Sequence, residues 1–146
     1  MHTFTYSNTG LNLTESFEGV RLTAYQDVKG IWTIGYGHTG PEVHPGLVIT
    51  QADADAWLLA DVKHAADTVN RLVTTDLAQD EFDALVDFAF NCGCGAFAGS
   101  TLLKDLNAGK LAEAAHQFEA WDKAGGEVIA GLLRRRMAEE QLFAAA

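Results

Sequence analysis

The sequence predicts an α+β fold in which a small antiparallel sheet is followed by a larger body of helices. Residues 21–49 hold five glycines and both prolines of the chain, placed between stretches rich in β-branched and aromatic residues. That composition is typical of short strands joined by tight turns. From Thr50 onward the apolar residues recur at helical spacing instead. Strands and helices are therefore segregated along the chain, which is the pattern of an α+β fold.

The elements follow in order from local signals. A short helix over 13–19, with Asn12 or Thr14 near its start, is expected before the sheet, because Gly19 is a stop signal. Thr50 is a favourable N-cap with acids in the turn that follows, so a long helix is predicted over about 51–72. The remaining expected segments are strands at 21–27, 31–38 and 47–50 with a hairpin turn at Gly30, helices at 80–91, 101–108, 111–121 and 128–143, a glycine-rich break at 92–99 and a loop at 122–127.

The length of 146 residues suits one domain, 1–146. We expect a β lobe at about 20–50 and a helical lobe made by 51–146 together with the N-terminal helix. The long helix would join the two lobes, and a cleft between them is a usual place for a substrate site. The formal net charge of −10 argues against a nucleic-acid-binding protein, which would carry a basic stripe.

Several other classes of protein are disfavoured by what the sequence lacks. Cys92 and Cys94 are expected to be free thiols, because a disulfide across one intervening residue would be strained. The five histidines form no cluster at metal-ligand spacing, so neither a metal nor a cofactor is expected. Residues 1–17 lack the basic and apolar regions of a signal peptide, and no run approaches 18 apolar residues. We therefore expect neither a signal peptide nor stable membrane insertion.

The segment 17–38 combines two carboxylates and a hydroxyl with glycines and aromatic residues. A pair of acids on one wall of a cleft suits acid–base work on a glycosidic bond. Glu18 has apolar neighbours and is the candidate general acid, since burial raises the pKa of a carboxyl. Asp27 has polar neighbours and is expected to stay ionised, with the hydroxyl of Thr33 holding a water. The alternative is structural: Glu18 in a surface ion pair, Asp27 as the cap of a turn and Thr33 as a strand former.

The run EGVRLTAYQDVKGIWTIGYGH, residues 18–38, closely resembles the catalytic segment of phage-type lysozymes, the muramidase endolysins of glycoside hydrolase family 24. The family pattern is E-G-x-R-L-x-x-Y-x-D-x-x-G-x-x-T-I-G-x-G-H, and this sequence matches all of its fixed positions. The stretches 82–97, 100–109 and 131–143 resemble later parts of the same family. The resemblance covers nearly the whole chain, apart from about 40–75 and 121–128.

The resemblance implies a lysozyme-like fold and hydrolysis of the β-1,4 bond between N-acetylmuramic acid and N-acetylglucosamine in peptidoglycan, leading to lysis of the host cell. It implies Glu18 as the general acid, with Asp27 and Thr33 on the side of water attack in an inverting mechanism. Phe90 and Asn91 match positions that contact the substrate from the helical lobe.

A structural role and a functional role are both considered for His38 and for the basic run Arg134–Arg136. His38 is expected to support the site rather than to act as an acid or base. The basic run Arg134–Arg136 is expected to be a solvated face with ion pairs to Glu139 or Glu140. The alternative is that one of these arginines binds an anionic peptide stem or a muramyl carboxylate.

The family also implies partners and a location. Peptidoglycan would be the substrate, a holin would provide passage through the inner membrane, and the protein would be made in the host cytoplasm before it acts on the wall; we expect a monomer. Two other functions are kept open: a catalytically silent peptidoglycan-binding module, and a lytic transglycosylase or chitinase. A silent binder has no reason to keep all three candidate catalytic residues, and a transglycosylase would need the acid but no held water.

Overall fold

The computed structural model of the protein describes residues 3–124 and 126–146. Two expectations therefore fall partly outside the described residues. The segment 1–17, which lacks the features of a signal peptide, includes Met1 and His2, and the predicted loop 122–127 includes Gly125. The elements in chain order are α1 (Asn8–Glu18), β1 (Arg21–Gln26), β2 (Trp32–Gly35), β3 (His38–Thr39), α2 (Gln51–Leu72), α3 (Gln79–Cys92), α4 (Cys94–Ala98), α5 (Thr101–Asn107), α6 (Leu111–Gln117), the 3₁₀ helix η1 (Phe118–Trp121), β4 (Lys123–Ala124), β5 (Glu127–Val128) and α7 (Ala130–Ala144).

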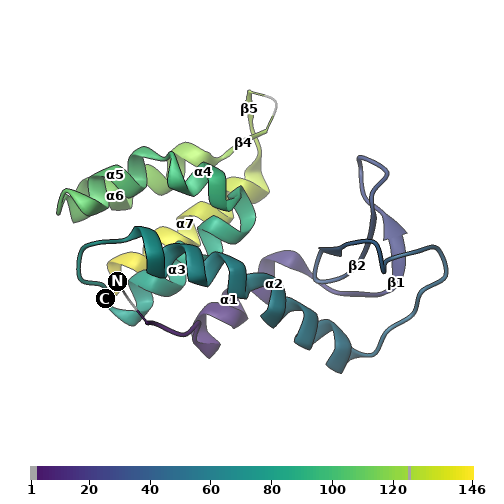
Figure 1. The fold of residues 1–146 in the computed structure, drawn as a ribbon. Helices are drawn as coiled ribbons and strands as arrows, with labels where there is room; N and C mark the ends of the chain where they lie inside the picture. Colours follow the sequence, from purple (N-terminus) through teal and green to yellow (C-terminus); the bar gives the residue numbers. More distant parts are fainter. Residues whose placement is uncertain (1–2, 125) are drawn as a thin grey trace.

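The predicted α+β architecture is confirmed. A three-stranded antiparallel sheet in the order β1-β2-β3 lies at one end of the molecule, and the helices form a body at the other end (Figure 1). Gly30 has a φ of 80°, which allows the predicted tight turn between β1 and β2. The stretch 47–50, predicted as a strand, instead runs beside β1 with a single bridge, Thr23 to Val48. The third strand is β3.

Helix α2 connects the sheet to the helical body, as the sequence predicts (Figure 1). The Thr50 hydroxyl accepts a hydrogen bond from the backbone N–H of Asp53 at 3.1 Å. The Asp53 carboxylate accepts one from the backbone N–H of Thr50, also at 3.1 Å. This reciprocal capping box satisfies two amides that would otherwise lack a partner at the start of the helix.

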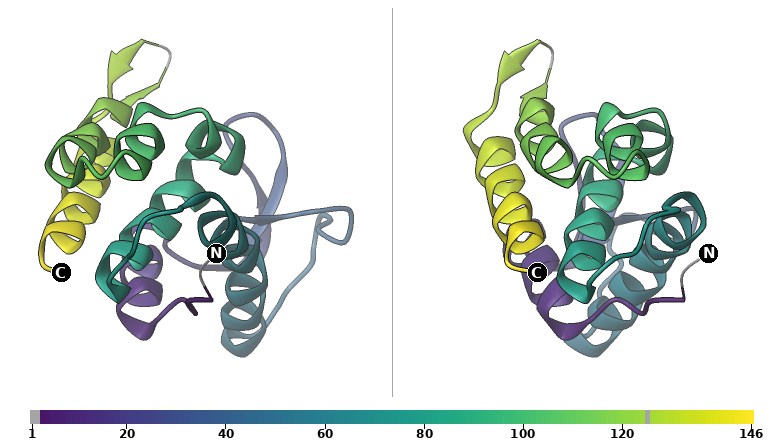
Figure 2. Two further views of the ribbon diagram at one scale, coloured as in Figure 1. Left: turned by 60° about the vertical axis from the view of Figure 1, so that its left-hand side comes forward. Right: turned by 90° about the vertical axis from the view of Figure 1, so that its left-hand side faces the viewer.

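Helix α3 is the centre of the helical body and packs against α1, α2 and α7 (Figure 2). Its residues Phe82 to Ala89 are all buried, including two aspartates. The ring of Phe88 meets the rings of Phe118 and Trp121 edge to face, each at a centroid distance of 5.6 Å. Burial of large apolar side chains of this kind stabilises the fold by about 1.5–3 kcal/mol each. These contacts join α3 to η1 within the core.

Three expectations about element limits are wrong. Helix α1 begins at Asn8, not near 13, because Ser7 is its N-cap and accepts a hydrogen bond from Gly10 N at 3.4 Å. The carboxylate of Asp83 on α3 holds Ser7 in turn. The predicted break at 92–99 contains the short helix α4, and the strands β4 and β5 pair as a hairpin within the predicted 122–127 loop and just beyond it. This hairpin projects from the helical body (Figure 1).

Candidate active site

Glu18 is the last residue of α1, where the chain leaves the helix for the sheet. Gly19 follows with a φ of 66°, a backbone conformation that favours glycine, and it turns the chain into β1. Gly37 approaches the carboxylate from the sheet side: a Cβ there would lie 3.9 Å from Glu18 Oε1. The two glycines therefore place the Glu18 carboxyl between the sheet and the helical body.

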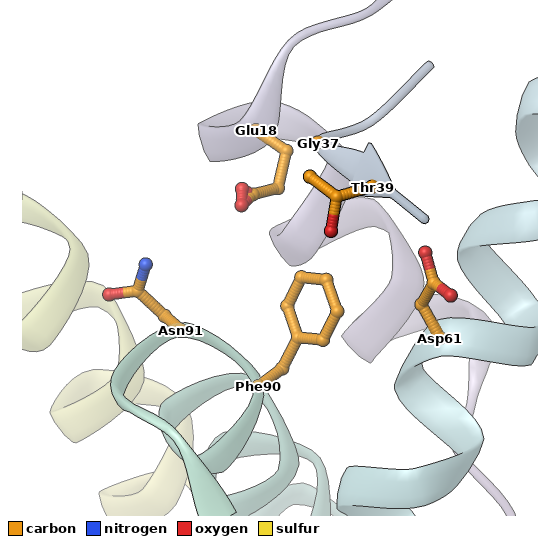
Figure 3. Close-up of a pocket in the computed structure, with 6 residues that line it drawn as sticks. All are labelled: Glu18, Gly37, Thr39, Asp61, Phe90 and Asn91. Atoms are coloured by element: carbon orange, nitrogen blue, oxygen red, sulfur yellow. The ribbon is translucent and has the colours of Figure 1, made fainter. Parts of the chain in front are cut away.

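A cleft of about 300 Å³ opens at this point. Its lining residues come from α1, α2, α3 and the segment around β3: Glu18, Gly37, Thr39, Asp61, Phe90 and Asn91. Figure 3 shows Glu18 and Asn91 reaching toward the same space from different elements, with the Phe90 ring between Asn91 and Asp61. Three of the residues predicted from sequence, Glu18, Phe90 and Asn91, are thus brought together.

The environment of Glu18 favours a protonated carboxyl. Burial raises the pKa of Glu18, and the nearby Arg135 guanidinium opposes this without cancelling it. The distance between Arg135 Nη1 and Glu18 Oε2 is 3.5 Å. A carboxyl with a raised pKa keeps a transferable proton closer to neutral pH, which is what a general acid needs.

Arg135 belongs to a buried charge network, and this corrects the expectation of a solvated face. Arg135 is 4% exposed and Arg136 is fully buried, while Arg134 is exposed. The predicted partner Glu139 is confirmed for Arg136, with an Nη2–Oε2 distance of 2.8 Å. Arg135 instead makes two hydrogen bonds to Asp87 on α3. No local pattern in the sequence indicates Asp87 as a partner, because it lies 48 residues away along the chain.

Asp27 lies in the turn directly after β1 and Thr33 lies on β2, and neither is among the residues that line the cleft. Asp27 Oδ1 accepts hydrogen bonds from the backbone N–H groups of Lys29 and Ile31, at 2.8 and 2.9 Å. Asp27 therefore caps the turn, as the structural alternative expected. Among the described residues, no hydrogen bond is made to its second carboxylate oxygen, Oδ2. Thr33 is buried and donates to the Ile31 carbonyl at 2.9 Å. The catalytic roles of Asp27 and Thr33 stay predictions.

His38 connects β3 to α2. Its Nδ1 lies 2.8 Å from Asp61 Oδ2, its Nε2 contacts Glu42, and its ring packs on Trp57 at 4.4 Å between centroids. Burial lowers the pKa of His38, but the hydrogen bonds with Glu42 and Asp61 outweigh it, so the pKa is raised. Because Asp61 lines the cleft, this contact is compatible with the predicted supporting role of His38, which stays a prediction.

Thr39 and Asp61 line the cleft although sequence reasoning missed them. Thr39 directly follows the motif that ends at His38, so its position beside the site was readable in the sequence. Asp61 lies in the middle of α2, and only the fold brings it next to β3. Among residues 3–124 and 126–146, no group of three or more His, Cys, Asp or Glu side chains is arranged to hold a metal ion.

The two cysteines are free, as predicted. Arg136 Nη1 lies 2.6 Å from Cys92 Sγ. Burial raises the pKa of the Cys92 thiol to about 11, opposed in part by Arg136. The thiolate is the reactive form of cysteine, so Cys92 is an unreactive packing group next to Asn91.

A small antiparallel sheet and a helical body that share a long helix, with an acid in the cleft between them, define a protein of the lysozyme fold. Comparison with known sequences and structures agrees. Residues 15–139 match the family described as phage lysozyme, and the chain belongs to that family.

Relatives match along nearly the whole chain. The endolysin of Bacillus phage B103 is 48% identical over 139 residues, which are 94% of this chain and 53% of that protein. This chain thus spans about half the length of that relative. The endolysin of Salmonella phage P22 is 41% identical over 94% of this chain and 96% of its own length. The muramidase domain of SpmX from Asticaccaulis excentricus superposes with a TM-score of 0.90 at 43% identity, covering 97% of this chain and 98% of that one.

Proposed function

We propose that this protein hydrolyses the β-1,4 bonds between N-acetylmuramic acid and N-acetylglucosamine in bacterial peptidoglycan. The observation that carries the proposal is the Glu18 carboxyl, with its raised pKa, in a cleft that also presents Phe90 and Asn91. Membership of the phage lysozyme family and the similarity to proteins named endolysin and muramidase domain support it.

In this mechanism the Glu18 carboxyl donates its proton to the glycosidic oxygen as the bond from that oxygen to the anomeric carbon breaks. A water attacks the anomeric carbon from the opposite face of the sugar and gives its proton to Asp27. Thr33 is proposed to orient this water, and the configuration at the anomeric carbon is then inverted. Asp27 then releases this proton to solvent and Glu18 takes one up, so both groups are restored, and the new chain end is a reducing muramic acid.

The cleft supplies binding as well as chemistry. The Asn91 side chain has both a donor and an acceptor, which suits the N-acetyl and hydroxyl groups of an aminosugar. The Phe90 ring gives an apolar surface beside it. Since the chain carries a formal charge of −10, we expect these local contacts, rather than long-range attraction, to hold an anionic wall polymer.

Product analysis tests the proposal against its main alternative. Purified peptidoglycan is digested with the wild type and with Glu18→Gln, and the released muropeptides are separated and weighed by mass spectrometry. Reducing muramic acid ends from the wild type alone support hydrolysis by Glu18. Anhydromuramic ends would assign a lytic transglycosylase instead, and equal release by both proteins would leave the chain a binding module with contaminating activity.

We further infer that the protein is a monomer that is made in the host cytoplasm and reaches the wall after a holin opens the inner membrane. The support is the similarity to phage proteins named endolysin. None of the described helices is both long and apolar enough to span a bilayer. Expression in a bacterial host with and without a co-expressed holin tests this route. Lysis that begins without the holin would contradict it.

A further inference from the structure

Asp87 is a fully buried aspartate on α3 that lies outside the lining of the cleft. Its two carboxylate oxygens accept hydrogen bonds from Arg135: Nε to Oδ2 at 2.9 Å and Nη2 to Oδ1 at 2.8 Å. The Thr14 hydroxyl of α1 donates to Oδ1 at 2.8 Å. Burial alone would raise the pKa of Asp87, but hydrogen bonds with Arg135, Glu139 and Thr14, together with the Arg135 charge, hold it at about 2, so the group is an anion at neutral pH.

The guanidinium of Arg135 therefore faces two carboxyl groups from one fork. Two of its nitrogens are engaged by Asp87, and the third, Nη1, is 3.5 Å from Glu18 Oε2. A lone guanidinium this close to a carboxyl would favour its ionised form and so remove the proton that an acid catalyst must hold. The charge of Asp87 opposes that effect and favours the protonated form of Glu18.

The other charged groups near this fork have partners of their own. Glu139 Oε2 is 3.9 Å from Arg135 Nε, but the Glu139 carboxyl is 2.7 Å from Arg136 Nε and 2.8 Å from Arg136 Nη2. Burial and the neighbouring Asp87 raise the pKa of Glu139. Arg136 also contacts Cys92. This leaves Asp87 as the anion that directly engages the Arg135 fork.

One further titratable group reaches the network from the N-terminal segment. The Tyr6 hydroxyl lies 2.7 Å from the Thr14 hydroxyl, and its pKa is raised by burial and by Asp87. Tyr6 is therefore a neutral hydrogen-bonding group at neutral pH. Asp61 is the other charged residue in the lining of the cleft.

We propose that Asp87 is a positioning residue for the reaction: it holds the Arg135 guanidinium by two of its nitrogens and balances its charge, so that Glu18 remains a proton donor. The proposal rests on the proposed function of Glu18 as the general acid. In this proposal α3 does more than pack. Arg135 contacts both Asp87 and Glu18, so the buried Asp87 carboxylate influences the acid in the cleft although Asp87 does not touch the substrate.

The Asp87→Asn variant tests this through its pH dependence. The amide keeps one acceptor for Arg135 but removes the compensating charge, so Arg135 stabilises ionised Glu18 more strongly. We expect the alkaline limb of the kcat/KM profile to move to lower pH by about one pH unit or more, the range for a newly uncompensated neighbour. At pH values above the alkaline limb of both proteins, kcat/KM falls about tenfold for each pH unit of that displacement and is regained on acidification. KM changes little, because Asp87 does not line the cleft.

Asp83→Asn is the matched control. Asp83 is also fully buried on α3, one turn before Asp87, but its partners are Ser7 and Gln79 and not Arg135. Loss of this carboxylate destabilises the fold without changing which charges surround Glu18. A general effect of removing a buried aspartate would move the profiles of both variants, and the proposal requires that only Asp87→Asn moves.

The double variant Asp87→Asn/Arg135→Gln removes both charges at once. Replacing a buried ion pair by neutral groups of similar size is often tolerated. We expect its alkaline limb to return toward that of the wild type, and the single variant Arg135→Gln to move the limb to higher pH. If Asp87→Asn alone does not fold, the effect of Asp87 is read from the difference between these two proteins, and identical limbs would overturn the proposal.

A direct titration of the Glu18 carboxyl by ¹³C NMR, in folded protein without substrate, separates this proposal from the proposed function. A lower pKa of Glu18 in Asp87→Asn than in wild type supports the positioning role, even if the wild type releases no muropeptides. An unchanged pKa of Glu18, together with an unchanged pH profile, would reduce Asp87 to a packing and stability role.

Discussion

The Glu18→Gln substitution removes the transferable proton and changes the shape of the side chain very little. The amide cannot protonate the glycosidic oxygen, so catalysis loses its general acid. Proton transfer by a positioned side chain contributes about 10²- to 10⁴-fold to the rate of such reactions. We therefore expect kcat on purified peptidoglycan to fall at least 10²-fold, with KM close to that of the wild type.

The same substitution should stabilise the fold at neutral pH. Burial raises the pKa of Glu18, and the Arg135 ion pair only partly offsets this, so the folded protein binds the proton more tightly than the unfolded chain does. The stability linked to this proton is present in full below about pH 4.3, the pKa of an unperturbed Glu, and is lost as pH rises through the folded-state pKa. A glutamine does not titrate and escapes this loss.

The size of the gain follows from the same linkage. Each pKa unit by which folding raises the Glu18 pKa corresponds to about 1.4 kcal/mol of unfolding free energy recovered by the variant at pH 7. For a chain of this length, about 1 kcal/mol moves Tm by about 2–4 °C. At pH 3.5 Glu18 is protonated in both states, and the difference in Tm between variant and wild type should disappear.

The assay combines muropeptide release with thermal unfolding at pH 7 and pH 3.5. Glu15→Gln is the control, because Glu15 lies on the same helix one turn earlier and outside the cleft; it should retain activity. Loss of activity without any gain in Tm at pH 7 would show that Glu18 is not destabilised by burial. Substantial activity in Glu18→Gln would refute its role as the acid.

Three further predictions concern the sheet and the opposite wall. His38→Gln should lower the free energy of unfolding by about 0.5–1 kcal/mol at pH 5.5 and change it little at pH 8.5. The pKa of His38 is raised, so the stability from its ion pair with Asp61 is fully present below about pH 6.5 and is lost as pH rises through the folded-state pKa. A change in Tm that does not depend on pH would contradict this. Asn91→Ala should raise KM about fivefold, the effect of one lost hydrogen bond of about 1 kcal/mol, with kcat nearly unchanged; an unchanged KM would exclude Asn91 from substrate binding. Asp27→Asn should lower kcat about 10²- to 10⁴-fold while the hairpin stays folded, because the amide oxygen can still accept the backbone hydrogen bonds at the turn; a loss below tenfold would mean that another group activates the water.

The parts of the fold that were predictable from the sequence are those set by neighbouring residues. Helix α2 starts at Thr50 because the capping box is built from residues three apart, and the first hairpin turns at Gly30 because its φ favours glycine. The start of α1 was not predictable, because Ser7 is held by Asp83 on α3, which lies 76 residues away along the chain. The β4–β5 hairpin is too short to give an alternating pattern.

The candidate site divides in the same way. Glu18, Phe90 and Asn91 belong to motifs, and the cleft brings them together. Asp61 and Asp87 lie within long helices whose apolar stripes gave no reason to single them out. The burial of Arg135 and Arg136 could not be foreseen either, since a run of three arginines in an acidic chain is ordinarily solvated. Their partners Asp87 and Cys92 lie more than 40 residues away along the chain.

A crystal structure of Glu18→Gln soaked with a peptidoglycan tetrasaccharide tests the central claim most directly. We expect the sugar chain to lie in the cleft between the sheet and α3, with a glycosidic oxygen within about 3 Å of the Gln amide and a water between the anomeric carbon and the Asp27 carboxylate. A saccharide bound on another face of the molecule, or one whose glycosidic oxygens all lie out of reach of residue 18, would contradict it.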